Sequence, residues 1–338
     1  MTNTTTLIPQ AATAKADSAH TGALDINEVF RGGGRSVEFL DQINKACIVM
    51  LDEAGIVPHA TAARIANGIA QVMSQARESS PRRSADYLDY EPRLTAVVGA
   101  DASRLHSGRS RQDIASTIAR MNLRNGLTQE IEALVSAREK TLALAQQHTE
   151  TIIPAYTHGV QAQPTTFAHY LHALAAALAR ETERLQQAFQ RINRNPLGAA
   201  ALATSSFPID RKRLAVLLGF EGQVENAYDA NHLAPVDSAL DVASALAIAA
   251  VQIGQFAQDM HAQYADPAPW FLLATGALTG VSSIMPQNAT RPRWSNCARK
   301  AASCWVRCRR CFCFRITIAP ACLTIACTIP CRARERCR

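Results

Sequence analysis

Cysteine, aromatic residues and secretion signals are all scarce over most of this 338-residue chain. Cys47 is the only cysteine before Cys297, which excludes a disulfide framework there and is typical of proteins from reducing compartments. Aromatic residues make up only 6% of the chain while alanine and leucine are abundant, a balance that favours helices over sheets. Met1–Gln10 has neither a basic start nor an apolar run, so we expect no secretory signal and a cytoplasmic protein.

The chain also has no long uninterrupted apolar run. The most apolar stretch, Ala239–Ala257, is broken by Asp241 and Gln252. A membrane span needs about 20 consecutive apolar residues, so this pattern predicts a buried helix and no membrane partner.

Acidic residues almost disappear in the tail formed by residues 288–338. The tail holds 12 Lys and Arg residues, one acidic residue and nine of the ten cysteines, and so carries a charge of +11. The other 287 residues hold 23 basic and 27 acidic residues, a charge of −4. The net charge of +7 therefore averages two unlike parts and does not indicate a nucleic-acid partner for the body.

The cysteines of the tail do not follow the spacing of a zinc site. Cys308-Arg-Arg-Cys311 has no second matching pair, and no histidine follows His261. We predict no metal site and no cofactor.

Apolar residues recur at helical spacing through most of the body, and no alternating strand pattern persists between turn signals. Ser110 and Asp113 resemble a capping box at a helix start, and Asp237 is predicted to cap a further helix that ends near Ala265. A heptad-like stripe follows Pro164, where a helix can begin. The sequence predicts an all-α protein with a bundle of long helices. The other predicted helices span 39–53, 60–75 and 128–151, and the stripe consists of Phe167, Leu171, Leu174, Leu178, Leu185, Phe189 and Ile192.

The chain is predicted to consist of four segments. Residues 1–26 lack periodicity and are expected to be disordered. Residues 27–105 form an N-terminal helical domain, 106–287 an incomplete central helical bundle, and 288–338 the Cys/Arg-rich tail.

Three segments carry residue types suited to chemistry. Arg104–Asp113 groups arginines, serines and a histidine before a helix, which suits either an anion site or a solvated helix start. Pro154–Pro164 places His158 and hydroxyl groups in a predicted loop, where a lone histidine is either structural or catalytic. Thr279–Pro286 is a Gly/Ser loop in which a serine can act as nucleophile or base if amides and a cation support it.

These segments belong to a longer ordered set. The set consists of Arg104–Asp113, Tyr156–His158, Gln161–Pro164, Asn193–Gly198, Phe207–Arg211 and Ser282–Gln287. In this order the segments resemble the fumarase/aspartase superfamily, and within it the argininosuccinate lyases, over roughly residues 27–287.

The resemblance implies an enzyme that eliminates an amine from a succinyl group and releases fumarate. A loop serine, here Ser283, would take the proton beside a carboxylate, and His158 would do acid/base or orienting work. The family's sites combine regions from three subunits, which implies a homotetramer. The residues that would contact the small-molecule substrate are Ser110, Arg111, Gln112, Thr157 and Ser282.

Several positions depart from the family pattern. This chain has Gln112 where the family has an asparagine. It has Tyr87 and Asp89 where the family has a histidine and an asparagine. Residues 234–237 read Ala-Pro-Val-Asp where Asp-Arg-Asp is usual, and Val281 replaces a glycine of the signature loop. These changes favour a related N-succinyl amine as an alternative substrate.

The largest departure follows Gln287. The family continues with Lys, Lys or Arg, Asn and Pro, whereas this chain reads Asn288-Ala-Thr-Arg291 and so lacks the lysine. If one base was lost here, the codons permit Arg-Asn-Pro, force Leu across Cys304/Trp305 and force Gly across Trp305/Val306. We therefore predict that the tail is a frameshift product and that the chain is truncated within its bundle.

Two other classes of function compete with the lyase. One is a non-catalytic helical scaffold, and the other is a helical body with a basic tail that binds metal or nucleic acid. An assay for fumarate release distinguishes the lyase from the scaffold. A measurement of bound zinc tests the basic, metal-binding tail.

Overall fold

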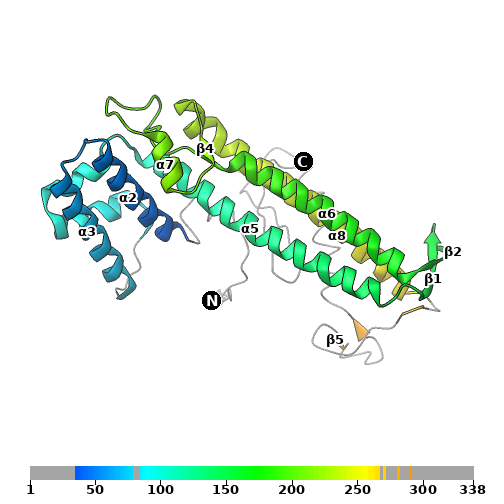
Figure 1. Cartoon of the computed structure of the whole chain (residues 1–338). Helices are drawn as coiled ribbons and strands as arrows, with labels where there is room; N and C mark the ends of the chain where they lie inside the picture. The colour runs from blue at the N-terminus through cyan, green and yellow to red at the C-terminus, as the bar shows by residue number, and fades with distance from the viewer. Residues whose placement is uncertain (1–34, 79–83, 267–268, 272–279, 282–288, 291–338) are drawn as a thin grey trace, which may run out of the picture.

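Helices dominate the computed structural model, which describes residues 35–78, 84–266, 269–271, 280–281 and 289–290 (Figure 1). This confirms the predicted all-α class. The helices are α2 (Ser36–Glu53), α3 (His59–Glu78), α4 (Tyr87–Val98), the 3-10 helix η1 (Ala100–His106), α5 (Arg111–Gln146), α6 (Phe167–Ile192), α7 (Arg211–Leu217), the π-helix η2 (Asp229–Leu233) and α8 (Ala234–Tyr264). Short strands pair as β1 (Ile152–Thr157) with β2 (Val160–Thr166), β3 (Arg194–Asn195) with β4 (Gly222–Gln223), and β5 (Gly280–Val281) with β6 (Ala289–Thr290).

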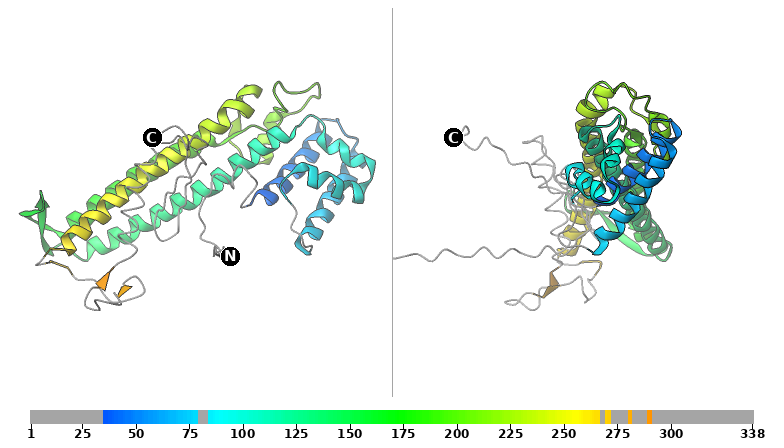
Figure 2. Two further views of the ribbon diagram at one scale, coloured as in Figure 1. Left: turned by 180° about the vertical axis from the view of Figure 1, so that it is seen from behind. Right: turned by 90° about the vertical axis from the view of Figure 1, so that its left-hand side faces the viewer.

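The N-terminal helices form one apolar core. Leu40 and Ile43 of α2, Ile65 of α3 and Leu94 of α4 are fully buried, together with residues of η1, α7 and the start of α5. Gly55, with φ +66°, follows the end of α2, as the predicted helix stop requires. These helices lie at one end of an elongated molecule (Figures 1 and 2).

A three-helix bundle of α5, α6 and α8 forms the second core and the long axis of the molecule (Figure 2). The predicted stripe on α6 is confirmed, because Leu171, Leu178, Leu185 and Ile192 are buried and each lies one heptad after the last. Alanine dominates the facing side of α8, so the helices can approach closely.

Helix α5 is longer than its sequence pattern predicted. A single 36-residue helix runs from Arg111 to Gln146, where the sequence pattern had predicted a separate helix over 128–151. Gly126 lies buried inside it and does not break it, since tertiary packing outweighs the local cost of a glycine. At 1.5 Å per residue the helix is about 54 Å long.

The loop predicted at 154–164 is instead a β-hairpin, so the expectation of no strands was wrong there. Thr157 pairs with Val160, which leaves His158 and Gly159 as a two-residue turn with φ values of +54° and +75°. Positive φ at both positions is the requirement of a type I′ turn, and an X-Gly pair is its sequence signal. The hairpin stands at the far end of the bundle from the N-terminal helices (Figure 1).

Helix α8 begins earlier than predicted. It follows the π-helix η2 without a break and starts at Ala234, so Asp237 lies in its first turn and does not cap it. Among the described residues, one helical stretch, Asp229–Tyr264, is long and apolar enough to cross a membrane by length and composition. A core helix meets the same criteria, and Val242, Ala243 and Leu246 of α8 are buried in the bundle core.

Candidate active site

The start of α5 gathers the first group of predicted site residues. Ser110 is the N-cap of α5: its side-chain oxygen accepts a hydrogen bond from the Gln112 amide at 3.0 Å, and its own amide donates to Asp113 at 2.9 Å. The capping box is therefore confirmed. The Ser110 hydroxyl hydrogen remains free of this cap, so the hydroxyl can donate to an anion at the positive end of the helix dipole.

Asp86 holds the side chain of Arg111 in place. Two hydrogen bonds, of 3.1 and 2.8 Å, join the Arg111 guanidinium to the Asp86 carboxylate, which also caps α4 through the Leu88 amide. Both side chains are about half exposed, so solvent screens the pair and a substrate carboxylate can compete for the guanidinium. Asp86 was not among the predicted site residues, although its position just before a helix marked it as a cap.

Gln112 contacts the π-helix. Its side-chain amide nitrogen donates a hydrogen bond to the Asn231 carbonyl at 3.2 Å. A π-turn often marks a functional segment, and here it packs against the residue that departs from the family pattern.

A cluster of a half-buried histidine, a buried tyrosine and a buried arginine supports this end of the candidate site. His106 stacks on Tyr87 with ring centroids 4.3 Å apart. The buried Arg109 guanidinium lies 4.7 Å from the centroid of the Tyr87 ring. Burial, and then the nearby Arg109 charge, lowers the pKa of His106 to about 4. His106 is therefore neutral at pH 7 and acts here as a packing group.

Asp113 ties the helix start to the loop after β3. Its carboxylate is fully buried and accepts hydrogen bonds from the amides of Gly198 at 3.0 Å and Ala200 at 2.9 Å, besides that of Ser110. Burial raises the pKa of Asp113 to about 6, against the three amides, which favour the ionised form. The loop and the start of α5 therefore form one rigid unit.

The tip of the β1–β2 hairpin carries the second group. Thr157 and His158 are exposed there, and the left-handed conformation of His158 is uncommon for a residue other than glycine. Tyr156 anchors the hairpin by donating a hydrogen bond of 3.3 Å to Asp266, beyond the end of α8. The Gln161 amide donates to the Tyr156 hydroxyl at 3.1 Å, so the hairpin is fixed to the bundle.

The two groups do not meet within one chain. Ser110, Arg111 and Gln112 lie at the first turn of α5, whereas Thr157 and His158 lie beyond its other end, so about 54 Å of helix separates them (Figure 1). Ser282 and Ser283 lie outside the described residues. One chain therefore carries the two groups of predicted site residues at opposite ends of its bundle.

Comparison with known proteins identifies the class. The family model described as Lyase matches residues 30–289, more than half of the chain. The chain therefore belongs to this lyase family, and the helical bundle is the fold of its relatives of known structure.

Within the family, the chain is similar to argininosuccinate lyases, which confirms the resemblance drawn from its motifs. It is 39% identical to that of Natronomonas pharaonis over 72% of this chain and 49% of the relative, and 39% identical to that of Ralstonia pickettii over 70% and 51%. A structure of an EDDS lyase variant with bound fumarate matches at 32% identity and a TM-score of 0.74, covering 83% of this chain and 55% of that one. The chain spans about half the length of the curated relatives it matches.

Proposed function

We propose that the protein is a carbon–nitrogen lyase of the argininosuccinate lyase type, which eliminates arginine from argininosuccinate and releases fumarate. The observation that carries this proposal is the similarity to argininosuccinate lyases together with matching site motifs at both ends of α5. The EDDS lyase variant with bound fumarate supports fumarate as the product.

The proposed reaction is an elimination in which each proton and electron pair is accounted for. Ser283 takes the proton from the carbon beside a carboxylate, the C–N bond breaks toward nitrogen, and the amine leaves with a proton supplied by an acid. Ser110, Arg111 and Thr157 would hold the carboxylates, whose negative charge increases as the proton leaves. His158 would supply or orient the acid group, and Ser282 would contact the substrate.

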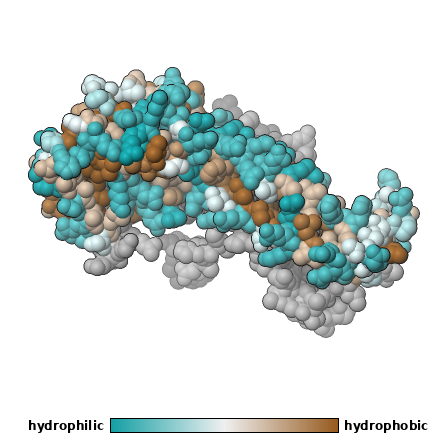
Figure 3. All heavy atoms as spheres, viewed as in Figure 1, coloured by the Kyte–Doolittle hydropathy of each residue, from teal (hydrophilic) through white to brown (hydrophobic). Residues whose placement is uncertain are grey.

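The active site in this proposal is shared between copies of the chain in a homotetramer. One chain cannot bring Ser110 and His158 together, because the helix between them is rigid and about 54 Å long. The bundle surface supports assembly, since Val135 and Leu144 of α5 and Ile248 of α8 are 39–40% exposed. Figure 3 shows such hydrophobic residues among hydrophilic ones along the bundle. Such an enzyme acts in the cytoplasm.

A different N-succinyl amine is the second candidate substrate. The Asp86 carboxylate lies against Arg111, and the Gln112 side chain, which departs from the family pattern, contacts η2, so both residues could select a different leaving amine. The match to EDDS lyase is in keeping with such a substrate.

Residues 288–338 enter the proposal as a frameshifted segment that replaces later bundle helices and the lysine of the signature loop. The chain as written is then inactive. Restoring the reading frame after codon 287 gives a second protein, called the frame-restored chain below.

Fumarate absorbance in the ultraviolet tests the activity. The frame-restored chain should release fumarate from argininosuccinate or, under the second candidate, from another N-succinyl amine, while the chain as written should not. The lyase proposal fails if the frame-restored chain, folded and tetrameric, turns over none of these compounds. If the gene has an intact reading frame and related genes encode the same tail, the frameshift proposal is wrong, while the lyase proposal is unaffected.

A further inference from the structure

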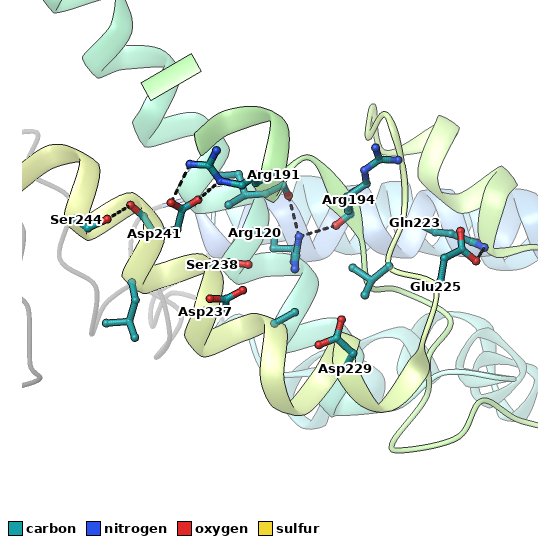
Figure 4. Close-up of a pocket in the computed structure, with 14 residues that line it drawn as sticks. Arg120, Arg191, Arg194, Gln223, Glu225, Asp229, Asp237, Ser238, Asp241 and Ser244 are labelled. Atoms are coloured by element: carbon teal, nitrogen blue, oxygen red, sulfur yellow. Dashed lines mark hydrogen bonds and ion pairs between the residues drawn. The ribbon is translucent and has the colours of Figure 1, made fainter. Parts of the chain in front are cut away.

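A large pocket opens where the end of α6 meets the start of α8. It has a volume of about 790 Å³ and lies between Arg191 and Ile192 of α6, the β3–β4 pair, the π-helix η2 and the first turns of α8 (Figure 4). Arg120 of α5 lies at its floor. None of the residues that line it is among the predicted catalytic or substrate-contact residues. Its volume is in the range of small-molecule sites.

Part of the charge in this pocket is already paired. Arg191 of α6 and Asp241 of α8 form a two-point ion pair with distances of 2.7 and 2.9 Å, which makes that wall neutral. On the opposite wall the Glu225 carboxylate accepts a hydrogen bond from the Gln223 side-chain amide at 3.2 Å and, within the described residues, forms no ion pair.

Arg120 is a buried cation without a carboxylate partner. It is only 4% exposed; one terminal nitrogen donates to the carbonyls of Ile192 at 3.0 Å and Arg194 at 3.2 Å, and its Nε has no hydrogen-bond partner. Burial lowers the pKa of Arg120, and the charges of Asp229 and Asp237 oppose this effect. Within the described part of the chain, neither carboxylate comes within ion-pair distance of a cationic nitrogen.

The charges that face the pocket therefore form a mixed pattern. Figure 4 shows the Arg120 guanidinium directed at the space bounded by Asp229, Asp237 and Ser238. The lining contains four carboxylates and three guanidinium groups, an excess of one negative charge. A simple anion would be repelled by the two aspartates, and a simple cation would be repelled by Arg120.

We propose that this pocket binds an α-amino acid with a long basic side chain. Its carboxylate would lie against Arg120, its ammonium group between Asp229 and Asp237, and its cationic side-chain end near Glu225, which matches the excess negative charge. Leu240 and Val224 would cover the aliphatic part of the side chain. The volume exceeds what a short amino acid fills. This proposal rests on the pocket alone and does not depend on the lyase activity.

Titration calorimetry on the full chain tests the proposal with defined probes. L-arginine and L-lysine should bind at least ten times more tightly than agmatine, which lacks the carboxylate, succinate, which lacks the amine, and L-alanine, which lacks the long side chain. Equal binding of agmatine and L-arginine, tighter binding of succinate, or no binding of either basic amino acid would overturn it.

Variants locate the binding in this pocket. Asp237→Asn, at an exposed position, should weaken L-arginine binding at least tenfold, while Glu139→Gln on the exposed face of α5 should change it less than twofold. Leu240→Trp, at the half-exposed rim, should block the pocket and serves as the second variant if Asp237→Asn melts early. Unchanged binding in a folded variant of either kind contradicts the proposal.

Discussion

The carboxylate of Asp113 shows how much one residue can organise at the start of α5. Its bond to the Ser110 amide was predictable from the local Ser-x-x-Asp pattern. Its bonds to Gly198 and Ala200 were not, because these amides are 85 and 87 residues away and only the fold brings them near. The same holds for the contact between Gln112 and Asn231.

Replacing Asp113 with asparagine should destabilise the protein. The amide group has one acceptor oxygen instead of two and directs an N–H group at buried N–H donors, so we expect a loss of about 2–4 kcal/mol in the free energy of unfolding. Urea denaturation measures it. Asp210→Asn at the N-cap of α7 is the matched control, and it should cost only a few tenths of a kcal/mol, because asparagine caps helices as well as aspartate does. Equal losses in the two variants would refute the role given to Asp113.

The stacked histidine His106 should make stability depend on pH. Its pKa is about 4 in the folded protein and about 6.5 when unfolded, so unfolding takes up a proton between these values. The free energy of unfolding therefore falls as the pH drops from about 6.5 to about 4, by about 1–2 kcal/mol after screening of this partly exposed group. Asp113 acts in the opposite direction, since its pKa is raised to about 6.

The variant His106→Phe isolates this effect, because it keeps the stack on Tyr87 and removes the titrating group. The difference in stability between wild type and variant should change across this pH range. His172→Phe, at an exposed position of α6, is the control. A difference that stays constant from pH 7 to pH 4 would rule out the protonation of His106 as the cause.

At the scale of elements, helical periodicity predicted α2, α3, α6 and α8 with end shifts of a few residues. The β1–β2 hairpin was missed because prolines and small residues hide the alternation in 152–166, and because only Ile153 of β1 is buried. The His158-Gly159 pair was the available signal for it.

The stripe on α6 should carry much of the stability of the bundle. Leu185 is fully buried among α5, α6 and α8, so Leu185→Ala should cost about 3–5 kcal/mol in the free energy of unfolding. Leu144→Ala on α5, where the side chain is 40% exposed, should cost less than about 1 kcal/mol. Thermal or urea denaturation of both variants compares them. Similar losses in the free energy of unfolding for the two variants would contradict the place of Leu185 in the bundle core.

At the scale of the whole molecule, the motifs named the predicted site residues but not how far apart these residues lie in one chain. A sequence motif gives the order of residues along the chain but not the distance between them in space. That distance follows from the structure, in which α5 is one continuous helix. The domain boundaries at residues 105 and 287, the nature of the tail and the homotetramer stay predictions. A single chain carries the two groups of predicted site residues at opposite ends of its bundle, so the proposed active site would need more than one copy of the chain.

Complementation between two inactive variants tests this claim most directly. Ser110→Ala and His158→Asn, each made in the frame-restored chain, should release almost no fumarate alone. After denaturation and refolding as a mixture, they should regain a measurable fraction of the frame-restored activity, because some sites then combine an intact Ser110 from one copy with an intact His158 from another. A refolded, tetrameric mixture that stays as inactive as the separate variants, beside an active frame-restored chain, would contradict the shared site.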